Sequence, residues 1–179
     1  SNTETRISAT YEDGDGTIDL VVDAIPVDLT SSGTGTIAQA NIVNRKFTVT
    51  GSTDGDHSGD IVYIGSTTSM TTGALYHFKS DGTWELADAD AASTCDGLLG
   101  IALGAASNTN GVLLRGMVTI DHDPGAVGDV LFVSTTAGDI TATAPSGNGD
   151  IVRIVGYCLD ASNGQIWFNP DGAFVEVSA

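Results

Sequence analysis

The stretch that decides the fold covers residues 98–133 and reads LLGIALGAASNTNGVLLRGMVTIDHDPGAVGDVLFV. Its Val, Ile and Leu residues gather in three runs, over residues 98–103, 112–120 and 130–133. Side chains of this kind fit a pleated, half-buried surface. Turn-forming clusters separate the runs, and in them Asn110-Gly111 and Pro124-Gly125 reverse the chain. The stretch therefore predicts an antiparallel meander in the core of a small barrel or sandwich.

The composition of the whole chain agrees with an all-β fold. Hydrophobic residues make up 41% of the 179 residues, which is enough for a core, whereas aromatic residues make up only 6%. The core must therefore consist mainly of Val, Ile, Leu and Ala. The 23 glycines suit many short strands joined by tight turns rather than helices.

The charge of the chain excludes two classes of partner. Six Lys and Arg residues stand against 23 Asp and Glu residues, which gives a formal net charge of −17. So few cations cannot neutralise phosphates, and we expect no nucleic acid and no anionic membrane surface as partner. The apolar runs are also too short for membrane insertion. The acidic residues serve either solubility, which we favour, or cation binding. We expect no cofactor, and a structural divalent cation has no specific support.

The first residues predict a β-hairpin. Apolar and polar residues alternate over 7–11 and 17–23, on either side of the acidic turn Asp13-Gly14-Asp15-Gly16. This segment lacks the further ligands of a calcium-binding EF-hand loop, so we interpret it as a turn. A hairpin alone is marginally stable in water, so this one must pack against another domain or against copies of itself.

Changes in composition divide the chain into three parts. Residues 1–30 form the hairpin or stem segment, the Ser- and Gly-rich residues 31–46 form a linker, and residues 47–179 form a β-barrel or β-sandwich tip domain. Within the tip we predict a strand over 46–50, a short helix over 87–96, and strands over 139–145, 151–159, 165–168 and 173–177.

One short pattern recurs inside the tip domain. Gly59-Asp60, Gly128-Asp129 and Gly149-Asp150 each precede two aliphatic residues, a variable residue and a further aliphatic residue. We interpret each Gly-Asp pair as the end of a turn that leads into a buried strand. The spacing between the copies is too irregular for a solenoid or a propeller.

Two groups of residues are candidates for contact with a partner. Tyr76, Phe78 and Trp84 lie in a predicted hairpin with the turn Ser80-Asp81-Gly82. Their rings either form a platform on which a sugar stacks or stabilise the sheet as cross-strand pairs, and packing is the favoured interpretation. The second group comprises the loop residues Asp54, Asp56 and His57. Either a metal cluster or a solvated polar loop explains these three, and we favour the loop.

No catalytic motif is present in the sequence. It contains no phosphate-binding loop, no nucleophile elbow and no His-Glu-x-x-His pattern, so we expect no enzyme. Asp121-His122-Asp123 is the nearest approach to a metal or catalytic cluster, and a solvated turn before Pro124 is the simpler interpretation. Cys95 and Cys158 lack metal-ligand spacing, and a disulfide between them has no support in the sequence.

Two parts of the chain resemble bacteriophage virion proteins. The segment NTETRISATY, followed by TIDLVV at 17–22, is similar to the repeated stem unit of phage tail fibres, notably of phages with cyanobacterial and marine hosts. The remainder resembles small β-modules of fibre tips and capsid-decorating proteins. It does so through Gly100-Ile101-Ala102, the segment GVLLRGMV at 111–118, and Gly128-Asp129-Val130.

The resemblance implies a structural virion protein, exposed on the outside of the mature particle. We expect the C-terminal part of a tail fibre, assembled as a homotrimer with the rest of the fibre, that recognises a glycan or protein on the host surface. Tyr76, Phe78, Trp84, Asp54, Asp56 and His57 are the expected contact residues. The alternative is a capsid-decorating protein that cements the phage head. A fragment of a polysaccharide-degrading tailspike is disfavoured, because such enzymes need a long β-helix and placed carboxylates.

Overall fold

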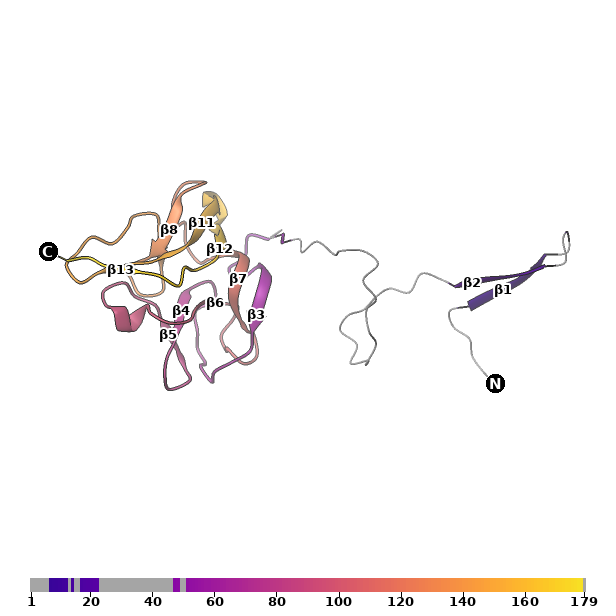
Figure 1. Cartoon of the computed structure of the whole chain (residues 1–179), viewed down its shortest axis with the longest axis horizontal. Coiled ribbons are helices and arrows are strands. Elements are labelled where there is room, and N and C mark those ends of the chain that lie inside the picture. Colours follow the sequence, from indigo (N-terminus) through magenta and orange to yellow (C-terminus); the bar gives the residue numbers. More distant parts are fainter. Residues whose placement is uncertain (1–6, 13, 15–16, 23–46, 49–50, 179) are drawn as a thin grey trace. The chain divides into compact units, whose positions relative to one another are not determined.

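The computed structural model describes residues 7–12, 14, 17–22, 47–48 and 51–178 (Figure 1). The chain divides into two compact units, residues 1–43 and 44–179. The predicted linker over 31–46 lies outside the described residues, as does most of the predicted strand over 46–50. The two described residues of that predicted strand, Phe47 and Thr48, belong to no strand in the structure.

The first unit contains an antiparallel hairpin of β1 (Ile7–Glu12) and β2 (Thr17–Val22). Its register pairs Ile7 with Val22, Ala9 with Leu20 and Tyr11 with Ile18, so apolar pairs alternate with pairs that contain polar residues. The predicted hairpin is therefore present. Apolar residues therefore pair with apolar residues at every second position of the register.

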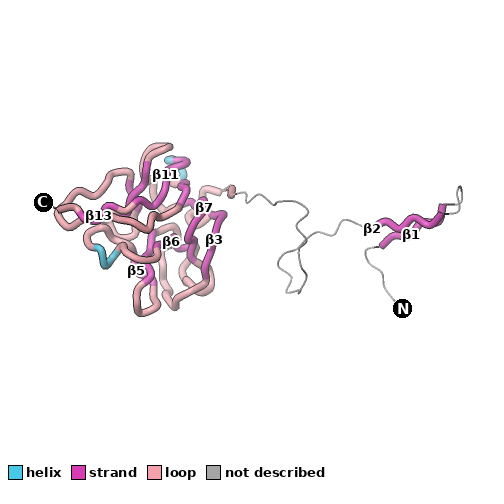
Figure 2. The backbone as a smooth tube through the Cα atoms, in the orientation of Figure 1, coloured by secondary structure: helices cyan, strands magenta, loops and turns pink. Residues whose placement is uncertain are grey.

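The second unit is a curled antiparallel sheet that forms a half-barrel, which agrees with the predicted all-β class. Figure 2 shows that loops connect most of its short strands. Eight strands follow the order β5-β4-β6-β7-β12-β11-β8-β9, and β3 pairs with β7. Their bounds are β3 His57–Val62, β4 Leu75–Phe78, β5 Trp84–Leu86, β6 Leu99–Ala102, β7 Val112–Thr119, β8 Val130–Val133, β9 Ile140–Thr141, β11 Ile154–Asp160 and β12 Gln165–Phe168.

Strand β7 lies at the centre of this sheet. It pairs with β3 along most of its length, with β6 at its start and with β12 at its end. The predicted meander is right for β6 and β7 but wrong for β8, which pairs with β11 instead of β7. Strand β12 occupies the place beside the end of β7, where it contributes the fully buried Ile166 and Phe168 to the core.

Aliphatic side chains dominate the core, as the composition predicts. The larger cluster draws on both halves of the sheet and includes Leu75, Leu99, Ile101, Leu113, Leu131, Val155, Ile166 and Phe168. A second cluster around the β4–β5 hairpin contains the aromatic residues Tyr76 and Trp84. Burial of this apolar surface is the main favourable contribution to folding.

The recurring Gly-Asp turn exists, but one of its three copies lies elsewhere. Asp129 accepts a hydrogen bond from Ala126 N (2.9 Å), and Asp150 accepts the equivalent bond from Gly147 N (2.7 Å). The third copy ends at Asp56, which accepts from Thr53 N (3.1 Å). In each copy the preceding glycine, Gly55, Gly128 or Gly149, has a positive φ of 84–91°, which favours glycine.

Gly59-Asp60 is not a turn, contrary to the prediction, because both residues lie inside β3. Gly59 stands opposite Gly116 of β7 in the register. A Cβ atom on Gly59 would lie 2.1 Å from Arg115 O, and one on Gly116 would lie 2.3 Å from Ser58 O. These glycines therefore allow the two backbones to approach closely, which is a different use of glycine from a turn.

The long strand predicted over 151–159 is interrupted at Arg153. Its first part is β10 (Ile151–Val152), which pairs with β13 (Val175–Glu176) in a separate two-stranded sheet, while β11 continues in the main sheet. The buried Arg153 side chain donates to the carbonyl oxygens of Cys95 (2.5 Å), Gly97 (2.9 Å) and Asp171 (2.8 Å). The chain changes partner at the residue that makes these bonds.

The remaining predicted elements are shorter than expected. The predicted strand over 139–145 is reduced to the two residues of β9, and the predicted helix over 87–96 to the 3-10 turn η1 (Ala92–Thr94). A second 3-10 turn, η2 (Ala161–Asn163), connects β11 and β12. The aromatic hairpin is confirmed, with Tyr76 opposite Leu86 and Phe78 opposite Trp84.

Candidate functional site

The three predicted aromatic contact residues lie together on the β4–β5 hairpin, but they are packed. Tyr76 is 5% exposed and Trp84 is 3% exposed, and the ring of Phe78 lies 4.9 Å from that of Trp84. The Tyr76 hydroxyl accepts a hydrogen bond from Thr71 N (2.8 Å), and Trp84 Nε1 donates to Ile64 O (3.0 Å). Burial and these bonds leave the rings little surface for a ligand, which agrees with the packing interpretation.

A cavity of about 420 Å³ lies beside this hairpin. Tyr76, Trp84, Glu85 and Leu86 line it, together with Asp88, Thr94 and Ala137. Because the two rings are buried and their polar atoms are bonded internally, they offer a ligand in this cavity little exposed aromatic surface.

The three residues of the second predicted group, Asp54, Asp56 and His57, do not form one cluster in the structure. Asp56 belongs to the recurring turn described above, and His57 begins β3 with its Nδ1 2.7 Å from Gly55 O. Asp54 is exposed and lines a cavity of about 210 Å³ with Asp121, His122 and Asp123. The structure thus brings one predicted contact residue to the Asp121-His122-Asp123 segment.

His122 is held by groups on both sides of its ring. Its Nδ1 lies 2.8 Å from Asp121 Oδ1 and 3.9 Å from Asp139 Oδ1. Its Nε2 lies 2.8 Å from Ile140 O and 3.0 Å from Ile140 N. The neutral ring therefore accepts from the Ile140 amide, and the protonated ring donates to the Ile140 carbonyl. The turn is more ordered than the solvated turn that the sequence suggested.

The surroundings of His122 favour its protonated form. Burial lowers the pKa of His122, but the hydrogen bonds to Asp121 and Ile140 and the charges of Asp139 and Asp121 outweigh that effect, and the pKa is raised. The ligand atoms of Asp121, His122 and Asp139 lie within 4.8 Å of one another. The carboxylates of Asp121 and Asp139 therefore face a ring whose protonated form they stabilise.

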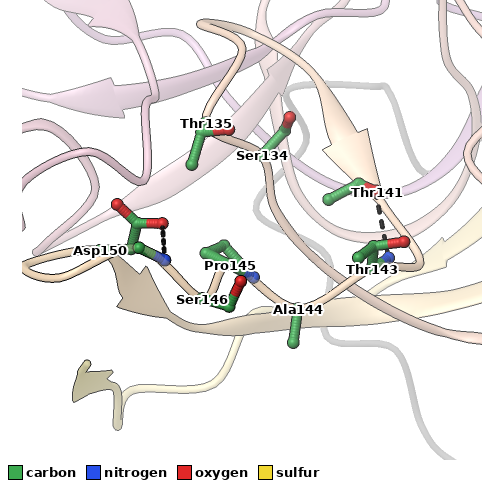
Figure 3. Close-up of a pocket in the computed structure, with 9 residues that line it drawn as sticks. Ser134, Thr135, Thr141, Thr143, Ala144, Pro145, Ser146 and Asp150 are labelled. Atoms are coloured by element: carbon green, nitrogen blue, oxygen red, sulfur yellow. Dashed lines mark hydrogen bonds between the residues drawn. The ribbon is translucent and has the colours of Figure 1, made fainter. Parts of the chain in front are cut away.

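A third cavity, of about 260 Å³, is lined mainly by hydroxyl groups (Figure 3). Ser134 Oγ accepts from Thr136 N, Thr141 Oγ1 accepts from Thr143 N, and Asp150 accepts from Gly147 N. These polar groups already stabilise turns, and no aromatic residue lines the cavity. Its lining therefore has a structural explanation.

The outward face of the sheet carries the exposed aromatic surface that the hairpin lacks. The cross-strand partners Met117, Trp167, Tyr157 and Val130 form a row across β7, β12, β11 and β8, which are labelled in Figure 1. Tyr157 is 48% exposed and Val130 is 36% exposed.

Trp167 is partly covered. The ring of Phe47 meets it edge-on at 5.4 Å, and the guanidinium of Arg115 lies 5.8 Å from its centre.

A fourth cavity adjoins this row. It measures about 320 Å³ and is lined by Ile154 and Tyr157 of β11 and by the loop Asn169, Pro170, Asp171 and Gly172. The sequence-based candidates include none of these residues. The alternation within β11 could have identified Tyr157. If Cys158 is buried, as its apolar surroundings suggest, its neighbours Tyr157 and Leu159 point outward.

The two cysteines are buried and unpaired. Burial raises the pKa of the Cys95 thiol to about 11, against the opposing charge of Arg153, and burial also raises the pKa of Cys158. Both side chains are therefore protonated near neutral pH and behave as small apolar groups.

No helix among the described residues is both long enough and apolar enough to cross a membrane. Comparisons with protein-family models, curated proteins and solved structures find no match to this chain.

Proposed function

We propose that this chain is the C-terminal part of a phage tail fibre, which assembles as a homotrimer and attaches the virion to its host. The observation that carries the proposal is the β1–β2 hairpin, a two-stranded unit with alternate apolar pairs. Two strands alone are marginally stable in water, so copies of the hairpin from neighbouring chains supply the missing packing. This arrangement suits a repeated stem.

The compact unit suits the tip of such a fibre. Its sheet presents the exposed row around Tyr157, and exposed apolar surface of this kind is typical of binding sites. Three copies on one fibre would each bind weakly, and their linkage would convert weak contacts into firm attachment.

The first test is the solution mass of the full chain, measured by light scattering on a size-exclusion column. We expect the mass of three chains. The variant Leu20→Asp places a charge in an apolar pair of the hairpin and should lower the mass to one chain. The control Ser8→Asp adds the same charge in a neighbouring pair that already contains a polar residue, and it should leave the mass unchanged. A monomeric wild-type chain at micromolar concentration contradicts the trimer.

A capsid-decorating protein is the second candidate, because the division into an N-terminal unit and a compact β-unit suits it equally. In that role the N-terminal unit grips capsid subunits. A chain that is monomeric in solution and oligomerises only on phage heads would favour it. The strand pairs of the described residues are all antiparallel, whereas a tailspike β-helix stacks parallel strands, and we do not propose the enzyme.

A further inference from the structure

Tyr157 is an exposed aromatic residue in the lining of a cavity. Nearly half of this residue is exposed, and it lines the cavity of about 320 Å³ with Ile154. That volume lies within the range of about 300–1,000 Å³ typical of small-molecule sites. The negative face of an aromatic ring attracts the weakly positive C–H groups on one side of a sugar ring. This wall of the cavity therefore suits a saccharide.

The rest of the cavity lining is the loop of residues 169–172, which backbone hydrogen bonds hold in place. Asn169 N donates to Val155 O (2.8 Å), and Asp171 N donates to Ile154 O (2.9 Å). Arg153 Nε donates to Asp171 O (2.8 Å), while the same guanidinium also bonds two carbonyls of the η1 loop. Since the loop is already ordered, a ligand loses little free energy in fixing it.

Two polar side chains on this loop keep free bonding capacity. The Asn169 carboxamide is exposed and makes no hydrogen bond with the described residues. Asp171 is also exposed, and only its Oδ1 accepts a bond, from Ala173 N (3.1 Å). An amide both donates and accepts, and a carboxylate accepts two bonds, so together they match neighbouring hydroxyl groups.

The charge of the site selects among saccharides. Asp171 lies in the cavity wall, and the chain carries a net charge of −17, while the nearby Arg153 guanidinium is buried and bonded to three carbonyl oxygens. An anionic sugar would bring its carboxylate next to another carboxylate, which like-charge repulsion opposes. A neutral hexose or N-acetylhexosamine meets no such repulsion.

Two other cavities described above lack this combination. The hydroxyl-lined cavity in Figure 3 has no ring, and the cavity beside the β4–β5 hairpin has rings that are buried and bonded internally. We therefore propose that Tyr157, Asn169 and Asp171 form a binding site for a neutral saccharide. This inference rests on the proposed role in host attachment, for which it names the ligand class and the contact residues.

The test is a titration of the full chain with methyl α-glucoside, methyl α-galactoside and N-acetylglucosamine, followed by the backbone amide NMR signals of residues 154–172. At least one of these sugars should shift the signals saturably, with a dissociation constant in the millimolar range. Glucuronic acid should not. A chain that shows no saturable shift with any of the three neutral sugars overturns the proposal.

Variants assign the binding to these residues. Tyr157→Ala and Asn169→Ala should each weaken binding by about tenfold or more. Asp171→Asn should retain the neutral sugar and admit glucuronic acid. The control Tyr63→Ala removes another exposed tyrosine, 59% exposed and outside the cavity, and should have no effect. Binding that persists in Tyr157→Ala overturns the proposal.

The outcomes separate this inference from the proposed function. A monomer that binds a neutral sugar contradicts the trimer and keeps the site, whereas a trimer that binds none does the reverse. If Tyr157→Ala lowers the solution mass instead, a second copy of the chain covers the ring, and the saccharide site is overturned.

Discussion

Two cross-strand aromatic pairs in this protein have opposite surroundings. Phe78 and Trp84 of β4 and β5 belong to a buried cluster, whereas Tyr157 and Trp167 of β11 and β12 face outward. The difference arises from a third segment. Ile64, Thr67 and Thr71 all make hydrogen bonds to Trp84 or Tyr76, so the chain between β3 and β4 covers the first pair. Strand pairing alone does not decide whether an aromatic residue stabilises the core or is available to a partner.

The largest expected effect is the loss of stability when the buried ring of Trp84 is removed. Trp84→Ala should lower the free energy of unfolding by about 3–5 kcal/mol, because it opens a cavity in a packed cluster. Tyr157→Ala should lower it by less than about 1 kcal/mol, because half of that residue is already exposed. Urea unfolding curves measure both values. Equal losses would show that the outward pair is as important for stability as the covered one.

A substitution of Arg153 tests whether the loop of residues 169–172, beside Tyr157, depends on the buried guanidinium. Arg153→Met keeps an unbranched apolar side chain but removes the guanidinium, which leaves three carbonyl oxygens without their donor, and it should cost about 3 kcal/mol. Amide exchange in residues 169–172 should accelerate. Arg115→Met is the matched control, since Arg115 is exposed and lies over Trp167, and its cost should stay below about 1 kcal/mol. Similar losses in both variants would contradict the proposed role of the buried bonds.

A substitution at Gly65 tests how closely the chain between β3 and β4 packs against Trp84. Gly65→Ala forces an L residue into a φ of +82° and places a Cβ atom 3.0 Å from Trp84 Cδ1, so it should cost about 1–3 kcal/mol. Gly82→Ala imposes nearly the same backbone strain, at φ +81°, with no atom within 4 Å of the new Cβ. The difference between the two variants in thermal unfolding reports the close contacts of the new Cβ atom, with the Trp84 ring and with Gly82 O (3.1 Å). Equal losses in the two variants would show that the chain between β3 and β4 accommodates the new Cβ atom without loss of stability.

The smallest expected effect is a pH dependence of stability that arises from His122, near the connection between β11 and β12. Ile120 N donates to Gly164 O (3.0 Å), which joins the turn of His122 to the β11–β12 connection. Because the folded pKa of His122 is raised, its stabilising contribution is complete below pH 6.5, the usual value, and is lost as the pH rises through the folded pKa. His122→Gln should remove this dependence, of less than about 1 kcal/mol, from unfolding curves measured across that range. A wild-type chain that gains stability through that window would contradict the raised pKa.

Much of the fold follows from local patterns in the sequence. Strands β6, β7 and β8 match the aliphatic runs, and the β4–β5 hairpin follows from its aromatic alternation and its turn. The pairing of β8 with β11 was missed, because it depends on which distant strand completes the core beside β7. The interruption at Arg153 was missed for a similar reason, since its three acceptors lie in segments far away in the chain.

The candidate site was harder to predict than the fold. Aromatic composition pointed to Tyr76, Phe78 and Trp84, which the chain between β3 and β4 covers. The exposed Tyr157 and the free carboxamide of Asn169 have no motif, and the Arg153 bonds that fix their loop cannot be read from spacing. A residue pattern identifies strands, whereas exposure depends on the final packing.

The position of β7 has a consequence for how the protein folds. Its partners β3 and β12 precede and follow it at long distances in the chain, so the ends of two long loops must meet before the sheet can close. Proteins dominated by such non-local pairing fold in milliseconds to seconds rather than microseconds. During synthesis, β3 leaves the ribosome well before its partner β7 and waits with its edge unpaired. The assembly of copies that we propose must therefore follow the slow closure of each sheet, since premature encounters would offer that edge to the wrong chain.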